Sequence, residues 1–363
     1  MYKRTLGLSL YVSLLIICTP SKAAIDIIFD YSYDTNNYFT DEMKYVMDQA
    51  AFAFESRMAN ETLGSLIPSD YNSSAVGILM IDNPTTGADL NVTFGSTTSE
   101  GNLVGKEDEI IIFAGAKAVG SSYLSYSRVE YNYNDLVNGD PYWDYMENRD
   151  YGYNDPAVFG GSLSINSDLN WYADTNLTSH SDALTSGKYD FYSTAVHELG
   201  HILGFNYWTF ASWDLVDVNE TVFNTSSVRS EYSGNDVPMV VDSMSLHFGD
   251  LNSSLINCDC HPAMSDINST NTRTPFSDID FAILQDLGYS ISGTPISNIG
   301  GTYQDPTLGG SYYVPVKQSY SSWLAANASA APEPHYIFPM LGGLIACFAG
   351  RKKYINLINR FFN

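Results

Sequence analysis

The stretch that most constrains this chain is "STAVHELGHILGF", residues 193–205, which sets two histidines four positions apart around a glutamate. In an α-helix, positions four apart lie one above the other, so His197 and His201 can direct both imidazoles to one point. Glu198 is rotated by about 100° from His197, so its carboxylate lies beside that point. Neutral imidazoles are good zinc ligands, and a carboxylate beside a metal can accept a proton from water. The pattern predicts a helical zinc site with Glu198 as general base.

The residues around the motif favour a helix as well. Apolar side chains recur at helical spacing through "KYDFYSTAVHELGHILGF", residues 188–205, and form rows around the histidines. An amphipathic helix whose histidines simply face solvent is the alternative to a metal site. The export signal, the helical context and Gly204 each count against it.

The longer string His-Glu-x-x-His-x-x-Gly, which ends at Gly204, resembles the signature of the metzincin metalloproteases. In that clan the glycine lets the chain leave the helix sharply, a ligand on the far side completes the site, and a methionine turn passes beneath the metal. Tyr207 stands where the compact version of the motif has its third histidine. A neutral phenol is a poor zinc ligand, so the third ligand must lie elsewhere.

The first candidate for the third ligand is His247, in "VVDSMSLHFGD". Leishmanolysin-like metzincins carry a long insertion after the glycine, and their third histidine follows in a Ser-His-aromatic context that "SLHF" resembles. "HPAMSD" resembles the methionine turn, with Met264 beneath the zinc. "PFSDIDFAILQDLGY" matches the C-terminal helix of that fold, because Ser277 begins a Ser-x-x-Asp cap and Gly288 stops the helix.

Other residues compete with His247. Glu220 lies 19 residues after His201, a spacing seen in gluzincin peptidases, although "WDLVDVNETVFNTSS" is a poor helix sequence and those enzymes carry the glutamate on a helix. His261 lies three residues before Met264. Two more acidic residues remain open as ligands, Asp214 and Asp217.

The resemblance implies an α+β fold of the metzincin type, with a twisted mixed sheet, two long helices and a smaller irregular C-terminal subdomain. In that fold "SLSINSD", residues 162–168, would be the edge strand along which an extended peptide binds by backbone hydrogen bonds. The residue pattern itself predicts a helix over 40–59, capped by Thr40 or Asp41. It also predicts strands in four stretches, 24–33, 90–96, 109–119 and 160–174.

Composition divides the rest of the chain. Residues 120–158 are rich in Tyr, Asn, Asp and Gly, and we expect a long irregular segment there. Residues 291–331 turn to Ser, Gly, Pro, Tyr and Ala with little periodicity, which predicts a low-complexity linker. The predicted catalytic domain therefore covers 24–290.

Both ends of the sequence carry targeting patterns. Residues 1–23 have a basic start, an apolar run and small residues before a cleavage point, as export signals do. Residues 332–353 join Pro332-Glu333-Pro334, a short apolar run and a basic cluster, and resemble the PEP-CTERM sorting signal. That resemblance implies export through the inner membrane of a Gram-negative bacterium, transient membrane anchoring, and processing by a membrane sorting enzyme. The mature protein would reach the cell surface or extracellular matrix, and residues 354–363 would form a tail.

Charge and cysteine content restrict which molecules and ions the chain can bind. The chain has a net charge of -24, and residues 24–350 hold ten basic against 41 acidic residues, so we exclude nucleic acid as a partner. Calcium suits so acidic an exported chain as a second cation, although no consensus calcium loop is present. Cys258 and Cys260 are close enough only for a small strained disulfide ring, or for a second metal site together with His261.

These patterns together predict an exported zinc metalloendopeptidase that acts on protein or peptide substrates. Two other classes stay open at this stage. One is a surface or matrix protein that keeps the protease fold without activity, which Tyr207 and the segment "CDCHPAM" motivate. The other is a zinc hydrolase of a different kind. It would be either a gluzincin-type peptidase with Glu220 as third zinc ligand, or an enzyme that acts on a substrate other than a peptide.

Overall fold

The computed structural model of the chain forms two compact units, divided after Lys317, which are described separately. The second unit contains α7 (Tyr320–Ala330). The predicted export signal and sorting signal lie outside the described residues, which are 25–58, 61–120, 124–128, 130–134, 140–150, 158–178, 187–206, 209–210, 216–217, 221–242, 245–249, 251, 262–265, 273–293, 300–304 and 311–330.

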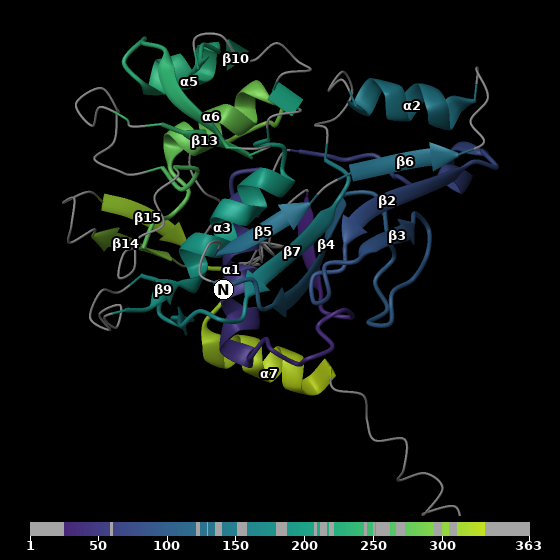
Figure 1. Cartoon of the computed structure of the whole chain (residues 1–363), viewed down its shortest axis with the longest axis horizontal. Coiled ribbons are helices and arrows are strands. Elements are labelled where there is room, and N and C mark those ends of the chain that lie inside the picture. Colours follow the sequence, from purple (N-terminus) through teal and green to yellow (C-terminus); the bar gives the residue numbers. More distant parts are fainter. Residues whose placement is uncertain are drawn as a thin grey trace, which may run out of the picture. The chain divides into compact units, whose positions relative to one another are not determined.

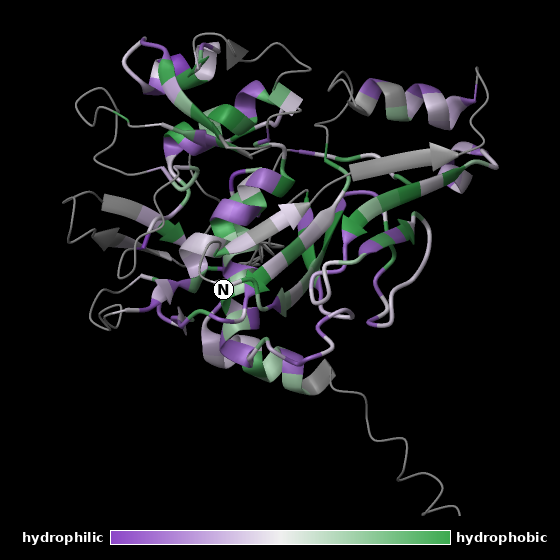
Figure 2. Cartoon of the chain, in the orientation of Figure 1, coloured by the Kyte–Doolittle hydropathy of each residue, from purple (hydrophilic) through white to green (hydrophobic). Residues whose placement is uncertain are grey.

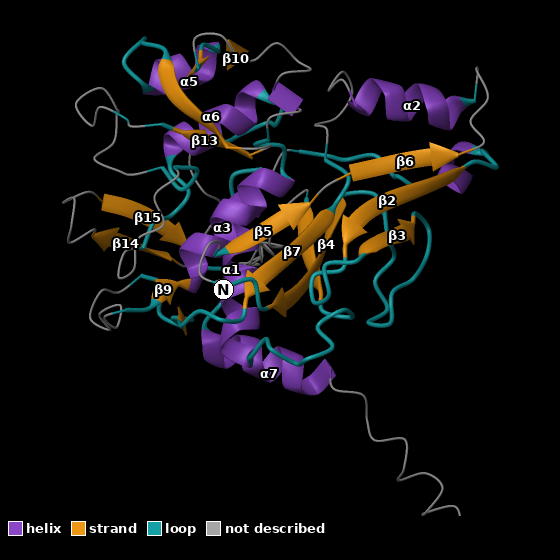
Figure 3. Cartoon of the chain, in the orientation of Figure 1, coloured by secondary structure: helices purple, strands orange, loops and turns teal. Residues whose placement is uncertain are grey.

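A four-stranded sheet in the order β1-β4-β7-β5 forms the centre of the first unit (Figures 1 and 3). Three strands run parallel to one another: β1 (Asp26–Asp30), β4 (Glu109–Lys117) and β7 (Gly161–Asn166). The fourth, β5 (Ser125–Arg128), is antiparallel to β7 and ends the sheet. β7 is therefore an interior strand, and the prediction that residues 162–168 form the edge strand is wrong. Its six residues are all buried, as an interior position requires.

Two helices cover one face of this sheet. The first is α1 (Asp41–Glu55), where Thr40 accepts a hydrogen bond from Met43 N at 3.3 Å, which confirms Thr40 as the predicted cap. The second is α3 (Phe191–Ile202), the predicted motif helix. The two helices pack against each other, α1 on β1 and α3 on β7 and β5. The mixture of helices with a mixed sheet confirms the α+β class.

A second sheet, in the order β3-β2-β6, covers the other face. It consists of β2 (Val76–Asp82), β3 (Asp89–Thr93) and β6 (Glu130–Asn134), and α2 (Pro141–Asp150) packs on it. Hydrophobic residues of β2, drawn in green in Figure 2, meet β4 in a buried cluster that includes Leu79, Phe113 and Tyr142. The first unit thus has two hydrophobic layers, one on each side of the central sheet.

The expectation of an irregular segment over 120–158 is wrong, because β5, β6 and α2 lie within it. β5 and β6 take their backbone hydrogen bonds from β7 and β2, which are distant in sequence. α2 buries only Tyr142 and Met146 among its described side chains, so the segment carries little hydrophobic periodicity.

The C-terminal part of the first unit holds smaller elements. A sheet in the order β10-β11-β12-β13 joins β10 (Val216–Asp217), β11 (Val222–Phe223), β12 (Val237–Asp242) and β13 (Ser245–Phe248). Two helices, α5 (Ser226–Glu231) and α6 (Asp278–Asp286), pack together. α6 begins with the predicted Ser277–Asp280 capping box. The remaining short elements are η1 (Pro68–Tyr71), β8 (Trp171–Tyr172) and β9 (Tyr189–Asp190).

The expected linker over 291–331 contains regular structure. A hairpin of β14 (Gly300–Gln304) and β15 (Ser311–Pro315) belongs to the first unit, followed by α7 in the second. Lys317, just after β15, attaches the hairpin to α1. Its backbone N–H donates to Gln49 Oε1 at 2.8 Å, and its ammonium lies 3.2 Å from Glu55 Oε2. These contacts join residues more than 260 positions apart, which local composition cannot reveal. No helix in the described part of the chain is long and apolar enough to cross a bilayer.

The buried carboxyl of Glu55 predicts a pH dependence of stability. Burial raises its pKa from 4.5 to about 7, although Lys317 and the Ile27 N–H favour the charged form. Between those values the unfolded chain is ionised here while the folded chain is protonated, so unfolding releases a proton. The free energy of unfolding therefore falls as pH rises through this window, by at most about 3 kcal/mol.

Urea denaturation from pH 4.5 to 7.5 measures this dependence. We expect Glu55→Gln to flatten it, because the amide keeps an acceptor for Ile27 N without titrating, while Glu107→Gln at an exposed position leaves it unchanged. An equal slope in Glu55→Gln and wild type would contradict the assignment.

Candidate metal centre

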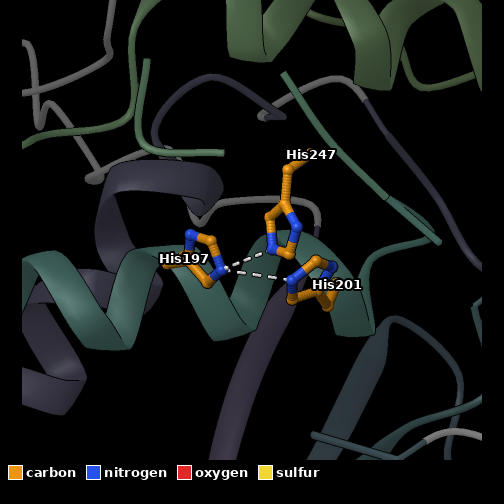
Figure 4. A group of neighbouring side chains, drawn as sticks. All are labelled: His197, His201 and His247. Atoms are coloured by element: carbon orange, nitrogen blue, oxygen red, sulfur yellow. Dashed lines mark hydrogen bonds between the residues drawn. The ribbon is translucent and has the colours of Figure 1, made fainter. Parts of the chain in front are cut away.

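Three histidines converge between α3 and β13 (Figure 4). His197 and His201 extend from one face of α3, one helical turn apart, and His247 extends from β13. The Nε2 atom of His197 lies 3.1 Å from Nε2 of His201 and 3.3 Å from Nε2 of His247. One nitrogen from each ring lies within 4.8 Å of the other two, so the group can hold a metal ion. The structure thus brings His247 together with the two motif histidines.

A buried ion network fixes the first turn of α3. Asp190 caps the helix by accepting from Ser193 N at 3.0 Å, and it also lies 2.9 Å from a guanidinium nitrogen of Arg273. The same guanidinium lies 3.0 Å from Asp174, and all three side chains are buried. Arg273 keeps its charge, because the two carboxylates raise its pKa against the opposing effect of burial. Since a buried charge is costly without partners, this network fixes where the helix starts.

The backbone around the site sets the tautomers of the two motif histidines. Nδ1 of His197 lies 2.6 Å from the carbonyl oxygen of Ala263, and Nδ1 of His201 lies 2.6 Å from that of Phe205. A carbonyl oxygen only accepts, so each Nδ1 carries the proton and each Nε2 presents a lone pair. Gly204 makes the second bond possible: its φ of +116° turns the chain so that the Phe205 carbonyl points back to the helix.

The short Nε2 contacts fit a bound cation. Two Nε2 atoms that both present lone pairs cannot hydrogen bond to each other, so their approach is repulsive unless a positive ion lies between them. In a tetrahedral site with metal–nitrogen bonds of 2.0–2.1 Å, ligand nitrogens are about 3.3 Å apart, close to the separations of His197 from its two neighbours. Nδ1 of His247 is buried and finds no hydrogen-bond partner among the described residues. These three side chains could therefore hold a metal ion.

Burial keeps two of the rings neutral. Together with the neighbouring imidazoles, it lowers the pKa of His201 to about 4 and the pKa of His247 to about 2. Both rings are unprotonated at pH 7, which is the state that metal ligands need. Protons therefore compete with a metal for these two ligands only in acid.

Met264 lies under the motif helix. It is fully buried, and its carbonyl accepts a hydrogen bond from Phe248 N at 2.8 Å, which joins this turn to the strand that carries His247. Asp280 of α6 accepts from the N–H groups of Ala263 and Met264 at 2.9 and 3.0 Å. One turn is therefore held by α6, contacts β13, and supplies the carbonyl that orients His197.

Glu198 lies where the α3 geometry predicts, with only 5% of its surface exposed. Its Oε1 accepts a hydrogen bond from Ser125 Oγ at 2.6 Å. Ser125 lies on the edge strand β5, inside the stretch that the sequence predicted as irregular, so this contact escaped the sequence analysis. An alternation of serine with bulkier residues in "SYSR" was the only local sign of a strand.

None of the other sequence-predicted ligands has a side chain among the described parts of the structure. Asp217 lies on the described strand β10, but its side chain is outside the described part of the structure. The remaining candidates lie outside the described residues: Tyr207, Asp214, Glu220, Cys258, Cys260 and His261.

No family model matches the chain, and no curated protein matches it. The function must therefore be argued from the site itself.

Packing between Met264 and α3 predicts the effect of enlarging Gly200. A Cβ atom at Gly200 would clash with the sulfur of the buried Met264 and lie 3.1 Å from the Phe276 ring, so Gly200→Ala displaces the Met264 side chain and strains the turn that carries it. Such overpacking costs about 1–3 kcal/mol, against a gain of about 1 kcal/mol in helix propensity. Because the turn orients His197, we expect metal affinity to fall by about 10–100-fold, as it does when outer-shell contacts of ligands are lost.

Competition with a chelating dye measures that affinity. Gly293→Ala is the control, because a Cβ atom there meets nothing within 4 Å. Unchanged affinity in Gly200→Ala would show that the turn does not support the site.

Proposed function

We propose that the chain is a zinc-dependent metalloendopeptidase of the metzincin type, nearest to leishmanolysin-like and matrixin-like enzymes. The observation that carries the proposal is the convergence of three imidazoles from α3 and β13 with Glu198 beside them. A merely structural zinc site has no need of a buried carboxylate next to its ligands.

The donor set favours zinc over other metals. Three neutral imidazoles with no thiolate or carboxylate suit a borderline ion, whereas magnesium and calcium prefer oxygen. Three protein ligands leave a fourth tetrahedral position open, as catalytic zinc sites do. His197, His201 and His247 are the residues that would hold the ion, and the position of His247 supports it over Glu220 as third ligand.

Zinc supplies Lewis acidity when bound, which polarises a carbonyl group and makes water more acidic. Glu198 carries the proton: its carboxylate takes one from the attacking water and delivers it to the nitrogen of the leaving amine. The carbonyls of Ala263 and Phe205 keep His197 and His201 in one tautomer throughout. Met264 and Asp280 keep the supporting turn in place.

A polypeptide substrate suits the edge of the central sheet. β5 pairs with β7 on one side, and in the described part of the chain no strand pairs with its other side. An extended peptide can add there by backbone hydrogen bonds, and Ser125 brings that edge next to Glu198. The proposal includes export by residues 1–23 and sorting by a membrane enzyme at Pro332-Glu333-Pro334, which places the enzyme at the cell surface or in the matrix of a Gram-negative bacterium.

Zinc content and casein cleavage, measured together on the mature chain, test the proposal. We expect the wild type to bind one equivalent of zinc and to cleave casein. His247→Ala should lose both properties. Glu198→Ala should keep zinc but lose activity by about 10²–10⁴-fold, the usual contribution of a general base.

Two further variants complete this test. Glu107→Ala, at an exposed glutamate, should match the wild type in both measurements. Zinc that survives His247→Ala and disappears in Glu220→Ala would contradict the metzincin ligand set. A wild type that holds zinc but cleaves nothing would instead indicate an inactive protein with this fold.

A further inference from the structure

The hydrogen bond between Ser125 and Glu198 joins the edge strand to the motif helix. Ser125 is the first residue of β5 and pairs with Ile165 of β7, so its side chain lies on the face of the sheet that α3 covers. Its Oγ donates to Glu198 Oε1 at 2.6 Å, across 73 positions of sequence. A short bond from a hydroxyl to a carboxylate is among the stronger hydrogen bonds in proteins.

The two motif histidines and Glu198 are each held by one hydrogen-bond partner from outside α3. His197 is held by Ala263 and His201 by Phe205, both through backbone carbonyls, whereas Glu198 is held by the side chain of Ser125. A buried carboxylate needs a donor, and here the donor comes from β5, the edge strand of the sheet among the described residues.

We propose that Ser125 is a positioning residue for Glu198, an inference that rests on the proposed function. By binding Oε1, the Ser125 hydroxyl restrains rotation of the carboxylate and leaves Oε2 to receive the proton of the attacking water. Because Ser125 belongs to the strand along which the peptide lies, one element sets the positions of both base and substrate. A small misplacement of reacting groups costs turnover more than binding.

Kinetics of peptide cleavage separate this role from a general structural one. We expect Ser125→Ala to lower kcat about tenfold, with KM within about twofold of wild type and zinc content unchanged, because the lost contact acts on the proton transfer. Ser125→Thr keeps a hydroxyl at the same position and should restore most of kcat. A wild-type kcat in Ser125→Ala, or no recovery in Ser125→Thr, would overturn the proposal.

Ser164→Ala is the matched control. Ser164 lies on the neighbouring strand β7, where its Oγ donates to Pro84 O at 2.7 Å. Its side chain lies on the opposite face of the sheet from Ser125, since side chains alternate along a strand. The variant thus removes one serine hydrogen bond from the same sheet without touching Glu198, and kcat per folded molecule should equal that of wild type. An equal loss of kcat in both variants would show that the effect is structural.

A double-mutant cycle tests the link without relying on activity. Tm is measured for the mature chain, with and without added zinc, in wild type, Ser125→Ala, Glu198→Ala and the double variant. We expect Ser125→Ala to lower Tm by a few degrees when Glu198 is present. In the Glu198→Ala background, the same substitution should leave Tm unchanged. Additive shifts would overturn the Ser125–Glu198 link even if the enzyme is active. A wild type that cleaves no peptide would overturn the proposed function, whatever the cycle shows.

Discussion

The site depends on two hydrogen bonds from imidazole to backbone. Because Ala263 and Phe205 offer carbonyl oxygens to Nδ1, the rings of His197 and His201 must present lone pairs at Nε2. Burial keeps the His201 ring unprotonated at neutral pH, so no proton on that ring relieves the repulsion between these lone pairs. A bound cation would relieve it, so the capacity of the site to hold a metal ion follows from how the backbone is folded around α3.

That backbone is held from several directions. Gly204 turns the chain at the end of α3 so that Phe205 faces back to His201, and Phe205 packs against Phe223 and Phe248. On the other side, Asp280 accepts from the N–H groups of Ala263 and Met264 while it also completes the cap of α6. A single carboxylate thus starts α6 and supports the turn whose Ala263 carbonyl orients His197.

The sequence predicted the parts whose signals are local. The four-residue spacing of His197 and His201, the cap at Ser277 and the apolar run of β4 each specify structure within one turn or one strand, and each is confirmed. The sequence could rank His247 first among the candidates for the third ligand but could not establish it as that ligand. The position of His247 depends on how β13 pairs with β12.

The parts that the sequence did not predict depend on distant partners. β5 has only four residues, and it is a strand because β7 pairs with it. Once β5 takes the edge, β7 becomes an interior strand and Ser125 comes beside Glu198. Likewise, the β14–β15 hairpin is joined to α1 by the contacts of Lys317 with Gln49 and Glu55. Hydrophobic periodicity has no means of recording such pairings.

The two ends of α3 carry side chains that suit the opposite partial charges of the helix dipole. At the N-terminus, Asp190 provides the negative charge that a helix start favours, and Arg273 compensates that charge inside the protein. His201 lies in the last turn, where the partial negative charge of the helix end favours a cation. The helix dipole therefore stabilises the capping carboxylate at one end and would favour a bound cation at the other. Glu198 and His197 lie between them, so one rigid helix would hold the proposed general base beside the proposed metal site.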